Sequence, residues 1–123
     1  ATKFITVTGK GELIAAVICP GVGISADALV NRTAQLPSVA IEKPEKILTS
    51  NTVKCIQAGL VYGNIGQVEY IVSKIKEELG EDGVKVIATG GFGSIIGTEA
   101  PSVDIYDPML TLKGLRLLAE KNR

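Results

Sequence analysis

The stretch Val84–Ser94, VKVIATGGFGS, decides the fold class of this chain. Its β-branched residues run between Gly83 and the pair Gly90-Gly91, a pattern typical of a buried strand in an α/β sheet. Ligands of open α/β sheets bind outside the carboxyl ends of the strands, and glycines there let the backbone approach a ligand that a side chain would exclude. We therefore predict a nucleotide-like ligand at Gly90 and Gly91, although this short motif does not specify which one.

Length and composition indicate one globular domain over residues 1–123. Of the 123 residues, 46% are hydrophobic and 21% are charged, which is enough to bury a core. Thirteen basic residues balance thirteen acidic ones, so no long-range field favours nucleic acid or an anionic membrane. The longest apolar run, Leu13–Cys19, is shorter than the roughly 20 residues of a membrane helix. No basic-then-apolar leader opens the chain, so we expect a cytoplasmic protein.

The residue types exclude several kinds of chemistry. The chain has no histidine, so histidine-dependent nucleophilic catalysis, metal binding and proton transfer cannot arise within it. Its carboxylates are scattered, which disfavours a metal enzyme. The two cysteines, Cys19 and Cys55, lie in apolar surroundings, and we interpret them as reduced packing thiols.

Hydrophobic periodicity predicts an α/β pattern with a mixed sheet. The expected order is strands at 4–8 and 12–19 around a turn at 9–11, a helix from 25 to about 35, a long helix ending at 79, a strand at 84–88, a short helix, a strand at 103–106 and a helix at 108–122. We expect Ser25 to cap the first helix and Asn51 or Ser50 to cap the long one. The second strand is expected to be the more buried strand of the hairpin.

Three glycines in the long helix need an explanation. Gly59, Gly63 and Gly66 share one helical face, and each costs about 1 kcal/mol relative to alanine in a helix interior. Close backbone approach is the obvious compensation. Intrachain helix packing, contact between two copies of the protein and contact with a ligand all remain open, and a symmetric homodimer through these glycines is a hypothesis.

Four segments in order resemble the second half of a type III pantothenate kinase. They are ICPGVGISADALVNRTAQLP (18–37), SNTVKCIQAGLVYG (50–63), VIATGG (86–91) and DPMLTLKGLRLLAEKN (107–122). The resemblance implies a ribonuclease H-like domain, the second lobe of the sugar kinase, heat-shock chaperone and actin superfamily. It implies phosphorylation of pantothenate by ATP, the first step of coenzyme A biosynthesis, with Mg²⁺ and a monovalent cation, K⁺ or NH₄⁺.

The resemblance also implies that the catalytic apparatus lies elsewhere. In this family an Asp-x-Gly-Thr phosphate loop runs directly into Ala-Thr, which matches Ala1-Thr2, so we expect that loop to precede residue 1. The catalytic aspartate of the family lies in a Gly-x-Asp-Arg segment of the first lobe, and nothing here matches it. We therefore expect no catalytic residue in this chain, a missing N-terminal lobe, and no turnover by the 123 residues alone.

The resemblance assigns a few binding residues. Thr52 matches the threonine that contacts pantothenate, with simple helix capping as the alternative. Gly90 and Gly91 match the adenosine-side glycines, with a plain strand-end turn as the alternative, and Thr89 is a candidate for capping or for contact with the ribose. Arg32 is a candidate interface ion-pair partner or a solvated surface residue.

Two acidic residues are further candidates, and the chain differs from the family pattern at two places. Asp104 and Asp107 lie near the expected ligand-binding edge, and capping is the favoured role for Asp107 before Pro108. Lys3 replaces the usual threonine or apolar residue, and Ala15-Ala16 replaces a frequent glycine pair.

Two other functions compete with the kinase half. One is a non-catalytic nucleotide-binding or dimerisation module of the same fold. The other is a dinucleotide-binding oxidoreductase fragment, suggested by Gly90, Gly91 and Gly93. The glycine spacing and the late position of this run in the chain disfavour the oxidoreductase.

Overall fold

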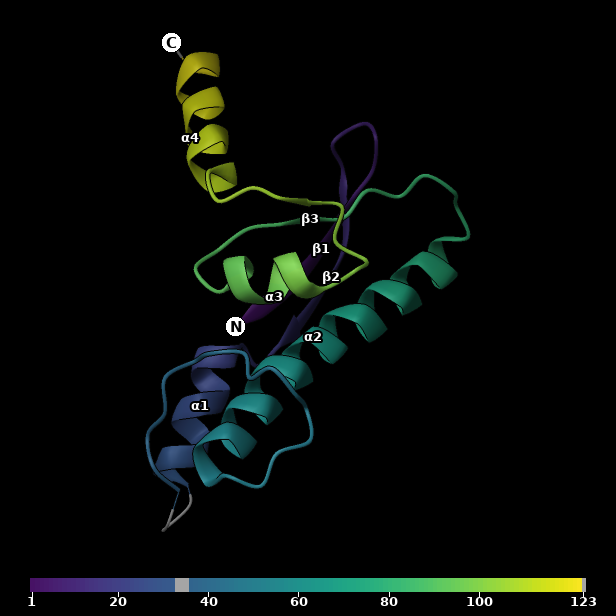
Figure 1. Ribbon diagram of the computed structural model, residues 1–123. Helices are drawn as coiled ribbons and strands as arrows, with labels where there is room; N and C mark the ends of the chain where they lie inside the picture. The colour runs from purple at the N-terminus through teal and green to yellow at the C-terminus, as the bar shows by residue number, and fades with distance from the viewer. Residues whose placement is uncertain (33–35, 123) are drawn as a thin grey trace. The chain divides into compact units, whose positions relative to one another are not determined.

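The computed structural model describes residues 1–32 and 36–122, and within them it confirms the predicted α/β class (Figure 1). The chain divides into two compact units, Ala1–Gln67 and the part from Val68 onward. The long helix α2, Thr52–Leu79, contributes residues to both units. Within the described ranges, no helix has both the length and the apolar character to cross a bilayer.

The chain begins with the predicted hairpin. Strands β1 (Thr2–Val7) and β2 (Leu13–Cys19) pair in antiparallel register. The turn closes through the Thr8 carbonyl, which accepts from the Gly11 N–H at 2.9 Å, and Gly11 has a φ of +84°. Glycine adopts this left-handed conformation without the Cβ penalty, which is why Gly-Lys-Gly forms the turn.

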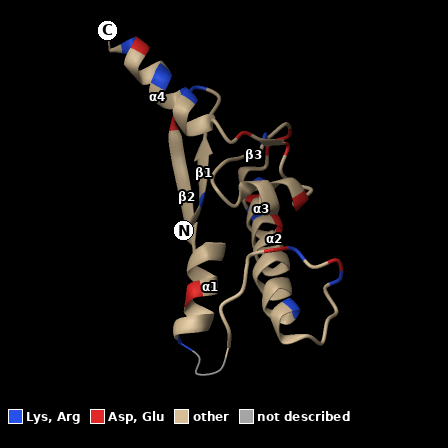
Figure 2. Cartoon of the chain, turned by 60° about the vertical axis from the view of Figure 1, so that its left-hand side comes forward, with Lys and Arg blue, Asp and Glu red and all other residues tan. Residues whose placement is uncertain are grey.

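The expectation that the second strand is the more buried one is wrong. Leu13 and Ile18 are 65% and 68% exposed, and Ile14 is also exposed. The two strands carry one charged residue, Lys3, so both are almost entirely uncoloured in Figure 2. Among the described residues no third strand pairs with this sheet, and a two-stranded sheet cannot bury its own apolar side chains.

Helix α1 spans Val22–Asn31, and the prediction that Ser25 caps it is wrong. The helix begins earlier, at the cap residue Gly21, and the Ser25 N–H already donates to the Gly21 carbonyl at 3.0 Å. A Cβ at Gly21 would lie 3.3 Å from the Ala1 backbone, so close packing against the start of the chain favours glycine there. The predicted helix end at Gln35 falls outside the described residues.

The core of the first unit joins α1 to the first half of α2. Val22, Ile56 and Leu60 form a buried cluster. Partly buried hydrophobic residues pack against it from α1 and from the irregular segment that follows, namely Ala26, Leu29, Leu36, Val39 and Ile41. The residues Ile56 and Leu60 of α2 are therefore buried, as their helical spacing predicts.

The segment from Leu36 to Asn51 has no regular secondary structure, and side chains of α2 hold it in place. The Tyr62 hydroxyl donates to the Pro44 carbonyl at 2.8 Å, and the Gln57 side-chain amide donates to the Ala40 carbonyl at 2.9 Å. These bonds replace the backbone partners that a strand or helix would supply, so the segment depends on Tyr62 and Gln57 for its position.

We expect Tyr62→Phe to lower the free energy of unfolding by about 1 kcal/mol, because it removes one partly buried hydrogen bond and keeps the ring. The matched control is Tyr70→Phe, since Tyr70 is exposed and its hydroxyl makes no hydrogen bond within the described chain. Urea denaturation followed by circular dichroism measures both variants. Equal stability of the two variants would show that the Tyr62–Pro44 bond does not anchor the segment.

The second unit contains the glycine-rich stretch. Its elements after α2 are β3 (Ile87–Ala88), α3 (Gly93–Glu99), β4 (Ile105–Tyr106) and α4 (Leu110–Lys121). The helix α2 ends as predicted at Gly80, which has a φ of +61° and donates its N–H to the Lys76 carbonyl. Glu69 fastens α2 to the loop before β4, because its carboxylate accepts from both the N–H and the hydroxyl of Ser102 at 2.9 and 2.7 Å.

The expected buried strand at 84–88 is shorter and less buried than predicted. Only Ile87 and Ala88 are in strand conformation, and Ile87 is 49% exposed. They pair in parallel with Ile105 and Tyr106. Since the described strands form two separate two-stranded sheets, one antiparallel and one parallel, the predicted single mixed sheet is not observed.

Candidate functional site

The residues Thr89, Gly90 and Gly91 form an exposed loop between β3 and α3. The Gly93 N–H donates to the Gly90 carbonyl at 3.2 Å and closes a turn. Gly90 has a φ of +106°, a conformation that residues with side chains rarely adopt. The structure thus brings together the three residues predicted for the adenosine side, and Gly90 is required by the turn itself.

Gly91 has no such local explanation. Its φ lies outside the left-handed region, and a Cβ built on it would meet no atom within 4 Å. Its N–H donates no hydrogen bond within the described chain. A side chain at position 91 would therefore fit the fold, and the open space beside its backbone is available to a partner outside the chain.

Tyr106, which the sequence predicts only as part of a strand, supports this loop. The Tyr106 hydroxyl donates to the Gly90 carbonyl at 3.1 Å. Its ring lies against Gly93, where a Cβ would overlap the ring and come within 3.0 Å of Cδ2. No sequence pattern reveals this contact, because it depends on the pairing of Ala88 with Tyr106 across β3 and β4.

Thr52 is the first residue of α2, and Asn51 caps the helix in its place. The Asn51 side-chain oxygen accepts from the Lys54 N–H at 3.2 Å, as one of the two predicted caps. The Thr52 side chain is exposed, and its hydroxyl makes no hydrogen bond within the described chain. Capping therefore does not explain the threonine, and Thr52 belongs to the first unit while the glycine loop belongs to the second.

The three helical glycines lie on an open face of α2. Gly59, Gly63 and Gly66 are exposed, and a Cβ at each would meet no atom within 4 Å. Intrachain packing against these glycines is thus not observed in the part of the chain that is described. Contact with a second copy or with a ligand remains as an explanation.

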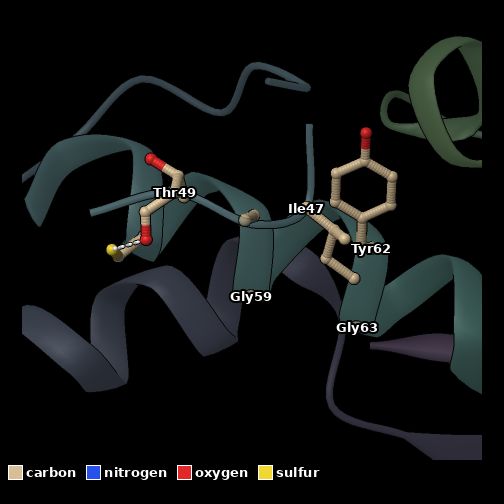
Figure 3. A pocket seen from close by; sticks show the side chains of 7 residues that line it. Ile47, Thr49, Gly59, Tyr62 and Gly63 are labelled. Atoms are coloured by element: carbon tan, nitrogen blue, oxygen red, sulfur yellow. Dashed lines mark hydrogen bonds between the residues drawn. The ribbon is translucent and has the colours of Figure 1, made fainter. Parts of the chain in front are cut away.

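A shallow hollow of about 420 Å³ adjoins two of these glycines (Figure 3). Its lining is mostly apolar and consists of Ile47, Thr49, Cys55, Ala58, Gly59, Tyr62 and Gly63. The Cys55 thiol donates to the Thr49 carbonyl at 3.2 Å, the dashed line in Figure 3. The anchored segment 36–51 therefore forms one wall of the hollow, and the missing glycine side chains enlarge it.

Comparison with known proteins identifies the family. The family model for type III pantothenate kinases matches residues 1–74. The chain belongs to the type III pantothenate kinase family. This confirms the resemblance drawn from the four sequence segments.

Two curated type III pantothenate kinases match this family member along almost its whole length. That of Moorella thermoacetica is 47% identical over 122 residues, which are 99% of this chain and 48% of the relative. That of Agathobacter rectalis is 49% identical over 121 residues, which are 98% of this chain and 46% of the relative. The chain therefore spans about half the length of the pantothenate kinases it matches.

Among residues 1–32 and 36–122, no three His, Cys, Asp or Glu side chains gather to hold a metal ion. Both cysteines are free thiols; Cys19 is half-buried, whereas Cys55 is exposed, so the interpretation of Cys55 as a packing thiol is wrong.

Two further charged candidates are Arg32 and Asp104. Arg32 is exposed at the end of α1. The Asp104 carboxylate accepts from the Val86 N–H at 2.7 Å and so bridges the segments that carry β4 and β3. The role of Asp104 is thus to order the strand pair next to the glycine loop.

Asp107 begins the turn that leads into α4. One carboxylate oxygen accepts from the Met109 N–H at 2.9 Å, and the other lies 2.8 Å from the Lys113 ammonium. Met109 is the N-cap of α4 and no side chain caps this helix, so the prediction that Asp107 caps it is wrong; the Asp107 carboxylate instead orders the turn before the helix. The hydrogen bond from Lys113, with that from the Met109 N–H, lowers the pKa of the Asp107 carboxyl.

We expect this carboxylate to make stability depend on pH. Because the pKa of Asp107 is lower in the folded state, its contribution is present above the unfolded pKa and is lost as the pH falls through the folded pKa. Asp107→Asn should unfold at lower urea concentration than wild type at about pH 7, and the difference should be smaller at about pH 3, below the unfolded pKa. A constant difference between the two proteins at both pH values would contradict a charge-dependent role.

Proposed function

We propose that this chain is the second lobe of an ATP-dependent pantothenate kinase, with a ribonuclease H-like fold, and that its Thr89–Gly91 loop receives the adenosine of ATP. The observation that carries the proposal is Gly91. It is exposed, its φ does not require glycine, and within residues 1–32 and 36–122 a Cβ on it would meet no atom within 4 Å beyond its two neighbours in the chain. A ligand lying flat against this backbone explains the glycine, and membership of a kinase family makes a nucleotide the fitting ligand.

Thr52 is the proposed contact to pantothenate. Its exposed hydroxyl is not used by the helix cap, which Asn51 provides. Pantothenate carries hydroxyl, amide and carboxylate groups, each of which can exchange a hydrogen bond with a threonine hydroxyl. A substrate at the beginning of α2 would also face the N–H groups that the first helical turn leaves without intrahelical partners.

The chemical step depends on groups outside this chain. Phosphoryl transfer is catalysed mainly by positioning and by stabilising the charge on the transferred phosphoryl group. This chain supplies the binding of adenosine and pantothenate, and the acid–base aspartate and the phosphate loops belong to the missing N-terminal lobe. Mg²⁺ would accompany ATP and neutralise phosphate charge, and its protein ligands, like those of K⁺ or NH₄⁺, are expected in that lobe.

The open glycine face of α2 is the proposed homodimer interface. Two helices can approach closely where glycines remove the side chains between them. A Cβ on Gly59, Gly63 or Gly66 would meet no atom from other elements of the described chain within 4 Å. The neighbouring apolar hollow would receive side chains of the second copy. We place the kinase in the cytoplasm, and neither nucleic acid nor a membrane is among the proposed partners.

A coupled assay tests the kinase. Full-length protein should consume ATP only when pantothenate is present, while the 123-residue chain should show no pantothenate-dependent turnover. Steady turnover by the 123-residue chain would contradict the assignment of the catalytic groups to the missing lobe. ATP binding without any pantothenate-dependent turnover in the full-length protein would favour the non-catalytic binding or dimerisation module.

A further inference from the structure

Tyr106 lies at the centre of the contacts that shape the glycine loop. Its hydroxyl donates to the Gly90 carbonyl at 3.1 Å, and the Gly93 N–H donates to the same carbonyl at 3.2 Å. Both acceptor positions of this carbonyl are thus occupied by the protein. The Gly90 carbonyl is held in one orientation, while the N–H of the following Gly91 has no partner in the described chain.

The ring of Tyr106 is fixed as firmly as its hydroxyl. It covers Gly93 at the beginning of α3, and Cδ2 lies 3.7 Å from the position of a Cβ on Gly97. On its other side the chain is tied to β3, because the Asp107 N–H donates to the Ala88 carbonyl at 2.8 Å. The tyrosine is therefore positioned by both the strand pair and the helix that flank the loop.

We infer that Tyr106 is a positioning residue for nucleotide binding: it fixes the orientation of the Gly90–Gly91 peptide so that the Gly91 N–H and the open backbone face the adenosine. The inference rests on the proposed function. Tyr106 touches no ligand in this account and acts only through Gly90 and Gly93. Glycine at position 93 is explained in the same way, since any side chain there would displace the ring.

Steady-state kinetics of the full-length protein test this role. Tyr106→Phe keeps the ring and removes the hydroxyl, so we expect the KM for ATP to rise about three- to tenfold, the effect of losing one hydrogen bond. The kcat, the KM for pantothenate and the melting temperature should stay close to those of wild type. Tyr70→Phe, which removes a hydroxyl without a hydrogen bond in the described chain, is the matched control.

Gly93→Ala supplies a second, independent perturbation. The new Cβ displaces the Tyr106 ring, so the KM for ATP should rise at least as much as in Tyr106→Phe. In a Tyr106→Ala background the ring is absent, and Gly93→Ala should then add little, because residues that act through one contact have non-additive effects.

The outcomes separate the two proposals. A wild-type protein that neither binds ATP nor uses it would overturn both the proposed function and the role of Tyr106. If the wild-type protein uses ATP and Tyr106→Phe has the same KM for ATP, only the role of Tyr106 would be overturned. If Tyr106→Phe raised the KM for ATP and the KM for pantothenate equally and also lowered the melting temperature, Tyr106 would have only a structural role. That result would also overturn the inference.

Discussion

Gly91→Val in the full-length protein is expected to weaken ATP binding by about 10- to 100-fold while leaving the fold intact. The branched side chain would occupy the space proposed for the adenosine, and forcing extra atoms into a filled site costs typically about 1–3 kcal/mol. The fold should tolerate the change because the φ of Gly91 is not left-handed and a Cβ there meets no atom within 4 Å.

The matched control for this variant is Gly9→Val. Gly9 is also exposed, its φ is not left-handed, and a Cβ on it would also meet nothing within 4 Å. Isothermal titration with ATP and a thermal melt should be recorded for both variants. Unaltered ATP affinity in Gly91→Val, or an equal loss in Gly9→Val, would show that the open face of Gly91 is not the nucleotide site.

Gly63→Leu is expected to convert a dimer into a monomer that is more stable than the wild-type monomer. Leucine is a better helix former than glycine by about 0.5–1 kcal/mol, and in the single chain its Cβ meets nothing within 4 Å. In a two-fold symmetric contact the same substitution appears twice at the interface, where the glycines allow close helix approach. The substitution should therefore destabilise the dimer and stabilise the monomer.

Light scattering and a thermal melt measure these two effects. Lys54→Leu is the control, because Lys54 is an exposed residue of α2 that lies about two and a half helical turns before Gly63 and therefore on the opposite face, and we expect its dimer mass to be unchanged. An unchanged dimer mass for Gly63→Leu would contradict an interface through these glycines. A lower melting temperature for the monomeric variant would show instead that position 63 is needed within the chain.

Local features of the fold were predictable where one residue type decides the conformation. Gly11 and Gly80 mark a turn and a helix end because both have positive φ, and Asn51 marks the start of α2 because its side chain can cap the helix. The long helix follows from its apolar spacing in the same way. These signals depend on only a few neighbouring residues, so turns and helix ends can be predicted from the local sequence.

Burial was less predictable because it depends on partners distant in sequence. Leu13 and Ile18 have the character of a buried strand, yet the described chain offers nothing to cover them. The apparent strand at 84–88 is reduced to Ile87 and Ala88 for a related reason, since it pairs only with the equally short β4. The curated relatives that match this chain are about twice as long as it is.

The glycines of the candidate site could be predicted from the sequence, whereas the tyrosine that holds the glycine loop in place could not. Gly90 and Gly91 stand out because two adjacent glycines follow an apolar run. Tyr106 does not stand out, since its hydrogen bond to the Gly90 carbonyl depends on the parallel register of β3 and β4. For Thr52 the sequence left capping open, and the bond between Asn51 and Lys54 removed that alternative.

Photolabelling tests most directly whether the Thr89–Gly91 loop receives adenosine. Full-length protein would be irradiated with an ATP analogue that carries an azide on the adenine ring and then digested with trypsin. We expect label in the peptide Val86–Lys113, which contains the loop, and loss of that label when excess ATP is present. Label that ATP displaces only from other peptides would contradict adenosine binding at this loop.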